Sequence, residues 1–502
     1  MHERYENQKI TDIFSDQHKL SLWQKTELAV IEARVKLGLV PLAIFEAIKN
    51  FWLDKPIDIL WWKERDKEIH HDLNAFVDER LRFLPNNYHQ YVHDKITSYD
   101  TEESAFIRML IEALEVIDDL YTDLKNVLRN SAIKYRYTIM NARTHGQEAE
   151  MQSLGARGLT WYKDLESAYA ILAATRENLK FSKLSGAIGK YGSIPSEVEK
   201  EALKILGFVP FYGATQIMPR VLYAPVANAL CDLALVIDKI ANDIRLSARS
   251  GNPLLQEPFK KKQKGSSAMP HKKNTIRTEG IEGNGILAKG YAAMITDCVK
   301  TWEERAIAQS RVERVAWPDL FHVVSDSLKT ITGVIIGIKV YPDNMLKEIY
   351  ESRGVYASSE VKEFLKKHLA SSGLEYEDIY RIVQLACFKV FEPSRERMEI
   401  RTKVASSFEE SSELLQKTAK LLPKETTICS IEIFIPAAML YVSEDLDISE
   451  EQVKKYNNAL AELFKDKSGR YKQEVMEEWH KLFTPEFLLK NENVLYKEIL
   501  GQ

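Results

Sequence analysis

Residues 101–121 read TEESAFIRMLIEALEVIDDLY and carry the pattern that decides the fold. Their apolar side chains recur at steps of three and four positions, at Ile107, Leu110, Leu114, Ile117 and Tyr121. This spacing places all of them on one face of a helix, as in the seam of a coiled coil. A second such seam comprises Leu230, Leu233, Ile237, Ile240 and Ile244. The sequence therefore predicts long helices that bury these faces in a bundle, and leftover apolar faces usually bury against copies of the same chain.

The rest of the chain extends this all-α prediction to three helical domains. A length of 502 residues is too great for one ordinary core, so two or three domains are expected. The chain has only 21 glycines and 16 prolines, which favours helices over sheets. We predict an N-terminal helical domain over residues 1–100, a central long-helix bundle over 101–340 and a C-terminal helical domain over 341–502. Amphipathic helices are expected in the last domain at 379–391 and 474–482.

Charge and cysteine usage exclude several classes of protein. A net charge of −4 gives no basic footprint for nucleic acid. No run of 18 uncharged apolar residues occurs and residues 1–30 are charged throughout, so neither a membrane span nor a signal peptide is expected. The cysteines at Cys231, Cys298, Cys387 and Cys429 are far apart, and no C-x-x-C spacing occurs. We therefore predict reduced thiols, no metal site and a cytoplasmic protein.

A polar segment at 260–274 interrupts the helical pattern and leads into the next apolar run. Its second part, 265–274, reads GSSAMPHKKN. Lys272 and Asn274 could bracket one carboxylate, and Ser266 could remove a proton in a closed site where cationic donors stabilise its alkoxide. A Walker phosphate loop is excluded because glycine does not directly precede the lysine. Considered alone, the segment is equally well interpreted as a solvated basic loop.

The spacing Gly-Ser-x-x-Met-x-x-Lys-x-Asn in this loop resembles the signature of the fumarase/aspartase superfamily, and SSAMPHK is similar to the form in adenylosuccinate lyases. The resemblance implies a helical homotetramer whose active sites are shared between subunits. It implies that Ser266 takes a carbon-bound proton while Lys272 and Asn274 stabilise the carboxylate that gains charge. Glu279, seven residues after Lys272, would orient the catalytic histidine. Thr275 stands where the family normally has proline.

A second motif, ARTHGQ at 142–147, resembles the family's Arg-Thr-His-Gly-Gln-His-Ala. A lone histidine inside a helix is more often a satisfied structural residue. Here Thr144 before His145 and Gly146 after it suggest a helix break that aims the imidazole into a cleft. The resemblance makes His145 the acid that protonates the leaving nitrogen, which suits an unperturbed pKa of about 6.5. It makes Thr144 a substrate contact.

Two pairs near the N-terminus match further family positions. Arg4 and Tyr5 stand where the family has an Arg-Tyr pair that reaches the nucleotide phosphate, although such a terminal pair would ordinarily be interpreted as frayed surface. His71 and Asp72 match the family's Thr-x-His-Asp, with Ile69 in place of the threonine. A capped helix start is the simpler interpretation of that segment. The resemblance counts His71 among the catalytic residues and Asp72 among the substrate contacts.

The segment from His93 to Asp100 resembles the family's His-x-Gly-x-Thr-Ser-x-Asp. The resemblance implies that Thr97 and Ser98 donate hydrogen bonds to a substrate carboxylate and that His93 lies near the phosphate. The residue types also suit a helix start, with Asp100 or Thr101 as the cap of a helix that opens at Thr101. We expect capping and binding together.

Two remaining motifs complete the expected site. Gln216, after Thr215, matches a family glutamine that contacts the succinyl part of the substrate. Arg305, Ser310 and Arg314 match the family's Glu-Arg-x-x-x-x-Ser-x-x-x-Arg. Two arginines nine positions apart can form a cradle for phosphate, provided that a bend or loop brings them to one side. The alternative is a solvated charged segment.

Together these matches predict a fumarate-releasing C–N lyase that acts on adenylosuccinate, giving AMP, and on the succinylated aminoimidazole carboxamide ribotide. The substrate is a succinylated purine nucleotide, and no metal or organic cofactor is needed. Two alternatives stay open. Another superfamily member, a carboxymuconate cycloisomerase or an argininosuccinate lyase, has related motifs, but the expected phosphate contacts favour a phosphorylated substrate. A non-catalytic helical bundle is the other alternative, although bundle packing does not require Ser266, Lys272, His145 or Glu279.

Overall fold

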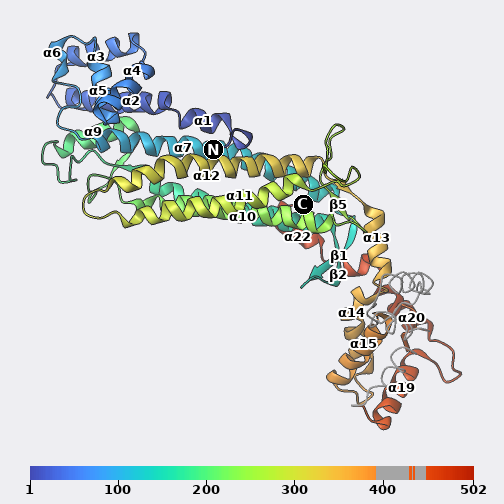
Figure 1. Ribbon diagram of the computed structural model, residues 1–502. Coiled ribbons are helices and arrows are strands. Elements are labelled where there is room, and N and C mark those ends of the chain that lie inside the picture. Colours follow the sequence, from blue (N-terminus) through green and yellow to red (C-terminus); the bar gives the residue numbers. More distant parts are fainter. Residues whose placement is uncertain (392–428, 432–433, 436–447) are drawn as a thin grey trace. The chain divides into compact units, whose positions relative to one another are not determined.

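The computed structural model describes residues 1–391, 429–431, 434–435 and 448–502 (Figure 1). The all-α prediction is confirmed, because helices form most of the described chain and its strands are few and short. The chain divides into two compact units. Unit 1 comprises residues 1–128, 161–249 and 255–339, and unit 2 comprises 129–160, 250–254 and the described residues from 340 onward. The division into three domains stays a prediction.

Short helices form the N-terminal part of unit 1. They are η1 (Glu3–Tyr5), α1 (Gln8–Ile13), α2 (Asp16–Lys36), α3 (Leu42–Asp54), α4 (Ile59–Ile69), α5 (Asp72–Leu81) and α6 (Asn86–His89). A cluster of buried side chains joins α2, α4 and α5 to the first turns of α7 and includes Trp23, Trp62, Phe76 and Met109. His70, with a φ of 54°, ends α4, and the adjacent His71 caps α5. Two helices therefore meet at a tight corner that carries both histidines.

Five long helices build the rest of unit 1. They are α7 (Ser98–Lys134), α8 (Leu154–Thr175), α10 (Ala224–Ser247), α11 (Ile276–Asp297) and α12 (Ile307–Ile336), of which α7 and α8 also extend into unit 2. Helices α10, α11 and α12 pack side by side (Figure 1). Both predicted seams are buried, with Leu114 and Ile237 fully inaccessible to solvent. The coiled-coil-like spacing therefore identified the helix faces that form the core.

Short elements connect the long helices. They are η2 (Arg176–Lys180), β3 (Phe181–Ser182), α9 (Ser196–Leu206), β4 (Val209–Pro210), η3 (Arg220–Leu222), β5 (Leu255–Gln256), η4 (Cys298–Lys300) and β6 (Lys339–Val340). Strand β3 pairs in parallel with β4, and α9 packs on α2. The segment Arg220–Ser247 is long and apolar enough to cross a membrane. Its apolar side chains are largely buried in the bundle, as in the core helix of a soluble protein.

Unit 2 contains the hairpin of β1 (Ile139–Thr144) and β2 (Gln147–Ser153) and the helices that follow unit 1. These elements are α13 (Pro342–Glu351), η5 (Val355–Ala357), α14 (Ser358–Leu369), α15 (Tyr376–Phe391), α19 (Glu450–Phe464), α20 (Gln473–Lys481), α21 (Pro485–Leu488) and α22 (Asn493–Leu500). The amphipathic helices expected at 379–391 and 474–482 are confirmed as α15 and α20. Trp479 lies at the centre of a buried aromatic cluster with Phe364, Phe434 and Phe464.

The hairpin corrects the expected helix break around His145. Strands β1 and β2 are antiparallel, and Thr144 pairs with Gln147. His145 and Gly146 form the two-residue turn and have φ angles of 54° and 78°. A tight hairpin turn with both central residues in the left-handed region matches the right-handed twist of strands. The glycine after the histidine therefore serves a β-turn, which helical periodicity could not predict.

Candidate active site

Five of the residues predicted from sequence line one cavity in unit 1. This cavity, here called the arginine cavity, has a volume of about 420 Å³. Its lining includes the predicted residues His71, Asp72, Ser98, Arg305 and Arg314. They come from the corner between α4 and α5, the start of α7 and the region where α12 begins. Segments far apart in sequence therefore converge on one polar, partly open site.

The two arginines reach the same cavity because the chain turns between Arg305 and the start of α12. Arg305 precedes α12, which begins at Ile307, whereas Arg314 lies two turns into the helix. The Nη1 atom of Arg305 donates to Oε1 of Gln216 at 2.8 Å, which fixes the guanidinium beside another predicted contact. Its guanidinium also lies 4.0 Å from the ring centre of Tyr99. The bend that a phosphate cradle required is therefore present.

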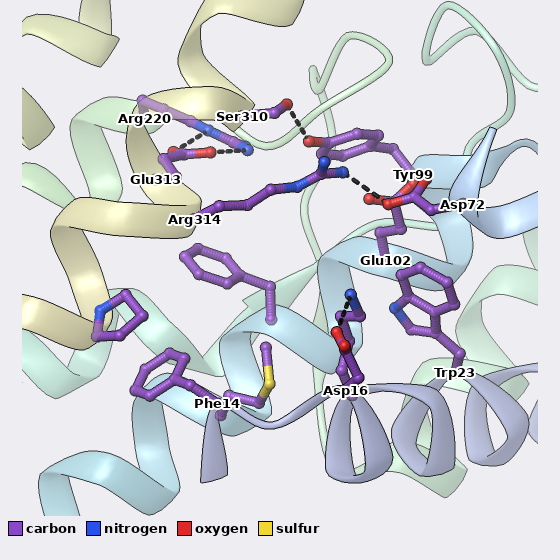
Figure 2. A pocket seen from close by; sticks show the side chains of 14 residues that line it. Phe14, Asp16, Trp23, Asp72, Tyr99, Glu102, Arg220, Ser310, Glu313 and Arg314 are labelled. Atoms are coloured by element: carbon purple, nitrogen blue, oxygen red, sulfur yellow. Dashed lines mark hydrogen bonds and ion pairs between the residues drawn. The ribbon is translucent and has the colours of Figure 1, made fainter. Parts of the chain in front are cut away.

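A second cavity adjoins the arginine cavity and shares three residues with it. This inner cavity has a volume of about 240 Å³, and Asp72, Glu102 and Arg314 line both cavities. Figure 2 shows Arg314 extending from α12 across the cavity to Asp72, where its Nη2 atom donates to Oδ2 at 2.7 Å. The rest of the lining combines apolar side chains, such as Phe14, Trp23 and Met109, with the charged side chains of Asp16, Lys19, Arg220 and Glu313. The inner cavity therefore has both apolar and charged walls.

Ser310 meets Tyr99 at the border of these cavities. The two hydroxyl oxygens are 2.5 Å apart, and both side chains are buried (Figure 2). Burial and the carboxyl of Glu102 raise the pKa of Tyr99 to about 12. The phenol therefore stays neutral at physiological pH and keeps a proton for hydrogen bonding.

A buried ion-pair network holds α7, η3 and α12 together beside the inner cavity. Nη1 of Arg220 lies 2.9 Å from Oε2 of Glu103, and its Nε atom lies 2.8 Å from Oε1 of Glu313. The hydroxyl of Tyr223 donates to Glu103 at 2.8 Å, and the backbone N–H of Met218 donates to the same carboxylate. Each buried charge is therefore paired and hydrogen-bonded, the condition under which burial is tolerated.

A second buried pair fixes the segment that carries Gln216. Lys183 and Asp100 are both fully buried, with Nζ and Oδ1 2.7 Å apart. The Lys183 ammonium also donates to the backbone carbonyls of Gln216 at 2.8 Å and Gly186 at 3.2 Å. The side-chain amide of Gln216 donates in turn to the carbonyl of Ala187. The loop that positions Gln216 is thus anchored by an ion pair that no motif indicated.

The start of α7 differs from the prediction in one respect. The helix begins at Ser98, three residues before the expected Thr101. Asp100 still serves the helix start, because its Oδ2 accepts from the backbone N–H of Thr97 at 2.9 Å. Ser98 lines the arginine cavity, whereas the Thr97 side chain is not among the residues that line either cavity.

The two predicted histidines of unit 1 have distinct settings. Nδ1 of His71 accepts from the backbone N–H of Asn74 at 3.2 Å, so the helix-cap interpretation applies while the residue also lines the arginine cavity. Nδ1 of His93 lies 2.8 Å from Oε1 of the buried Glu27. Burial lowers the pKa of His93, but the carboxylate of Glu27 outweighs it, so the pKa is raised overall. His93 is therefore held in an ion pair and lines neither cavity.

The segment 260–274, here called the signature loop, is exposed and folds on itself. Oγ of Ser266 accepts from the backbone N–H of Met269 at 3.1 Å, and the N–H of Lys272 donates to the carbonyl of Met269 at 3.0 Å. A Cβ at Gly265 would lie 2.0 Å from the carbonyl oxygen of Lys272, so only glycine fits this closure. Among the described residues, the side chains of Lys272 and Asn274 have no hydrogen-bond partner, which leaves both free for a ligand.

Helix α11 follows the signature loop directly. It begins at Ile276. Glu279 lies on its exposed first turn, and Oε1 accepts from the hydroxyl of Thr275 at 3.1 Å. The threonine that replaces the family's proline therefore contacts the glutamate expected to act in catalysis. The buried Glu257 anchors the same turn by accepting from the backbone N–H of Thr278.

One chain separates the predicted residues into groups. The signature loop precedes α11, whereas Arg305 and Arg314 follow it. The 22 residues of α11 span roughly 33 Å, so the loop and the two arginines lie far apart. Figure 1 shows the loop near β5, and α5 at the opposite end of the long helices. Thr144 and His145 belong to unit 2, where both are exposed on the hairpin. Arg4 and Tyr5 are exposed in η1 and line neither cavity.

Sequence reasoning missed Glu102, Glu103, Lys183 and Arg220. The sequence did contain a signal for Glu103. The seam of α7 continues from Ile107 towards the N-terminus in steps of four and three, which reach Glu103 and then Asp100. Carboxylates on a core stripe require buried cationic partners. Lys183 and Arg220 lie outside any periodic pattern, so their partners could not be assigned in advance. Within the described ranges, no cluster of three histidine, cysteine, aspartate or glutamate side chains could hold a metal ion.

Comparisons of the sequence identify the family, and comparisons of the structure identify the fold. The sequence profile of a lyase family matches residues 4–289. The adenylosuccinate lyase of Thermotoga maritima is 33% identical over 80% of this chain and 91% of its own length, and that of Synechocystis is 34% identical over 76% and 87%. Among solved structures, the β-carboxy-cis,cis-muconate cycloisomerase of Acinetobacter calcoaceticus aligns with a TM-score of 0.72 at 18% identity over 99% of this chain and 98% of its own. A fumarate lyase from Mesorhizobium gives 0.70 at 20% identity over 92% and 99%.

Proposed function

This chain belongs to the adenylosuccinate lyase family of the fumarase/aspartase superfamily, and from that premise we propose that it cleaves succinylated purine nucleotides with release of fumarate. Adenylosuccinate would give AMP, and the succinylated aminoimidazole carboxamide ribotide would give its carboxamide. The observation that carries the substrate class is the arginine cavity, where Arg305 and Arg314 line one site together with Asp72 and Ser98. Paired guanidinium groups suit a phosphate, which the carboxymuconate and argininosuccinate alternatives do not require.

The proposed reaction is a β-elimination. Ser266 removes a proton from the carbon next to the succinyl carboxylate that gains charge, and Lys272 and Asn274 stabilise the resulting dianion. The carbon–nitrogen bond then breaks, and the electron pair leaves with the nitrogen, which His145 protonates. Fumarate and the nucleotide are the two products, so protons and electrons balance without an external reagent. His71 belongs with these residues in the proposal, and Glu279 orients His145.

The remaining predicted residues would hold the substrate. Arg305, Ser310 and Arg314 bind the nucleotide end, and Gln216, fixed by its hydrogen bond from Arg305, contacts the succinyl part. The other proposed contacts are Arg4, Tyr5, Asp72, His93, Thr97, Ser98 and Thr144. Of these, His93 already pairs with Glu27 through its Nδ1 atom.

We propose a homotetramer with shared active sites. Within a single chain, the length of α11 separates the signature loop from the arginine cavity, so the two cannot form one site. An exposed seam on that helix supports this. Its members recur at steps of four and three and are Ile276, Gly280, Gly283, Leu287, Gly290 and Met294. The three glycines have open space where a Cβ would lie, and Leu287 and Met294 are 42% and 43% exposed. A small and apolar helix face of this kind suits close packing against another helix. We also propose that the protein acts in the cytoplasm.

The absorbance of adenylosuccinate, followed with purified protein, tests the reaction directly. We expect loss of the succinylated purine with release of fumarate, and a reduction of at least about 10³-fold in Ser266→Ala and in His145→Ala. Circular dichroism and sedimentation of both variants serve as controls for folding and assembly. If an intact tetramer turns over neither ribotide, the proposed substrates are wrong.

Shared active sites predict that the two inactive variants complement each other. Mixed and reassembled Ser266→Ala and His145→Ala chains would place an unmodified Ser266 and an unmodified His145 in some of the sites. Measurable activity is expected in the mixture and not in either variant alone. A mixture as inactive as its components, despite demonstrated subunit exchange, would contradict the sharing of sites.

A further inference from the structure

Glu102 is a carboxyl group at the ligand site that the proposed reaction does not use. It lies in the first turns of α7 and lines both the arginine cavity and the inner cavity. Figure 2 shows it beside Asp72, near the tip of Arg314. Across residues 1–391 and the described residues beyond, its carboxyl group has no hydrogen bond and no ion pair within 4 Å. Its neighbour Glu103, in contrast, accepts from three groups in the buried network.

An unpaired, partly buried carboxyl group at a cationic site calls for a physical explanation. Burial raises the pKa of Glu102 to about 7, and the negative charge of Asp72 contributes to the rise. Arg314, Arg305 and Lys19 oppose this rise, so these three cations support the ionised form. The charged groups that act on Glu102 come from α2 (Lys19), α5 (Asp72), α12 (Arg314) and the turn before α12 (Arg305).

Other titratable groups line the same cavities, and most are already paired. Asp16 bonds to Lys19 and Lys63, while Glu313 pairs with Arg220. Asp66, His70 and His71 line the arginine cavity on the side of α4 and α5. Among these groups, Glu102 is the carboxyl that combines an unpaired state, access to both cavities and proximity to both arginines.

We propose that Glu102 binds the substrate phosphate as a neutral carboxylic acid, donating a hydrogen bond to a phosphate oxygen, so that nucleotide binding takes up one proton. The inference rests on the phosphorylated substrate of the proposed function. A phosphate dianion between Arg305 and Arg314 neutralises the charges that support ionised Glu102 and adds negative charge beside it. An ionised carboxylate there would repel the ligand, whereas the protonated group supplies a donor. The proton comes from solvent and returns to it when the nucleotide leaves.

This proposal gives the affinity for a phosphate ligand a defined pH dependence. The free wild-type site loses the Glu102 proton as the pH rises above about 7. Binding must then restore the proton, so affinity falls by up to about tenfold per pH unit. Glu102→Gln keeps the shape and a donor but cannot ionise, and its affinity should stay level over the same range. Glu115→Gln, an exposed glutamate farther along α7, is the matched control and should follow the wild type.

Calorimetric titration with AMP and with inorganic phosphate, between pH 7.5 and 9, tests the proposal without turnover. The ligand's own ionisation contributes equally to all three proteins, so the difference between wild type and Glu102→Gln isolates Glu102. Wild type should take up close to one proton more per site than Glu102→Gln, measured in buffers of different ionisation enthalpy. At pH 9 the variant should bind roughly 10- to 100-fold more tightly.

Parallel pH profiles of the wild type and Glu102→Gln would overturn the proposal, as would a failure of both phosphate ligands to bind. The turnover assay separates this outcome from the failure of the proposed function. If adenylosuccinate is cleaved while the ratio of the two proteins' KM values is independent of pH, the lyase assignment stands and the role of Glu102 is wrong.

Discussion

The signature loop and the arginine cavity belong to the same unit and differ in how they are held. The loop carries the half-buried Ser266 and the exposed Lys272, and its few hydrogen bonds close it on itself. The inner cavity that adjoins the arginine cavity is lined by Arg220 and Glu313 of the buried network. The buried Lys183–Asp100 pair anchors Gln216, the residue to which Arg305 donates. The proposed binding site is therefore held by buried partners, whereas the groups proposed for chemistry lie on a segment with few restraining contacts.

This difference matches the demands of the two tasks. Binding a phosphate repeatedly in the same place requires side chains whose positions are fixed by packing and by buried partners. Excluding water from a carbanion requires a segment that can close over the substrate and open again. Substitutions in the cavity network should therefore act on stability or affinity, and substitutions in the loop should act on turnover. Four predictions test that division.

The largest expected effect is loss of stability on removal of Glu103. Glu103→Ala leaves the buried Arg220 with one carboxylate and strips acceptors from Tyr223 and Met218. Breaking a buried pair by removing one partner costs about 3–5 kcal/mol. Urea denaturation followed by tryptophan fluorescence measures the free energy of unfolding. The exposed Glu115→Ala on the same helix should change it by less than about 0.5 kcal/mol, and equal effects of the two would contradict the role of the network.

The next effect should appear in substrate affinity. Arg314→Ala removes a guanidinium from the arginine cavity and leaves Asp72 unpaired. A charge-assisted hydrogen bond contributes about 1.5–3 kcal/mol, so KM should rise roughly 10- to 100-fold with a smaller change in kcat. Arg311→Ala, an exposed arginine one turn earlier on α12, should leave both constants near wild type. A loss confined to kcat would place Arg314 outside the binding half of the site.

The same division explains how much the sequence could predict. The seams at Leu114 and Ile237 identified the buried faces because burial repeats with the helical period. The motifs led to Arg305 and Arg314, because the spacing of the two arginines around Ser310 resembles the family's pattern. They did not lead to Lys183 or Arg220, because long-range ion pairs have no local pattern. They also assigned His145 to a broken helix, although the His-Gly pair suits a hairpin turn.

A smaller effect on turnover is expected in the signature loop. In Gly265→Ala the new Cβ would meet the carbonyl oxygen of Lys272 at 2.0 Å, so the loop must open at its base. Because the loop is exposed, the melting temperature should not change, while kcat should fall about tenfold as Ser266 is displaced. Gly192→Ala, at an exposed glycine with open space around its Cβ position, is the control. A lower melting temperature with unchanged kcat would assign Gly265 a structural role.

The smallest expected effect is a pH-dependent change in stability, which should occur on substitution of His93 and not on substitution of a histidine in the signature loop. Burial lowers the pKa of His93 and Glu27 raises it more, so the folded-state pKa lies above the ordinary value of about 6.5. Protonated His93 therefore stabilises the fold fully below the unfolded pKa, and this contribution disappears as the pH rises through the folded pKa. Asparagine tolerates the φ of 52° at this position, so His93→Asn removes the pair without new backbone strain. We expect His93→Asn to be less stable than wild type by about 1 kcal/mol at pH 6 and by much less at pH 9.

His271→Asn in the exposed signature loop, where the described chain offers the histidine no partner, should match wild type at both pH values. A stability difference for His93→Asn that grows with pH would contradict a stabilising ion pair between protonated His93 and Glu27.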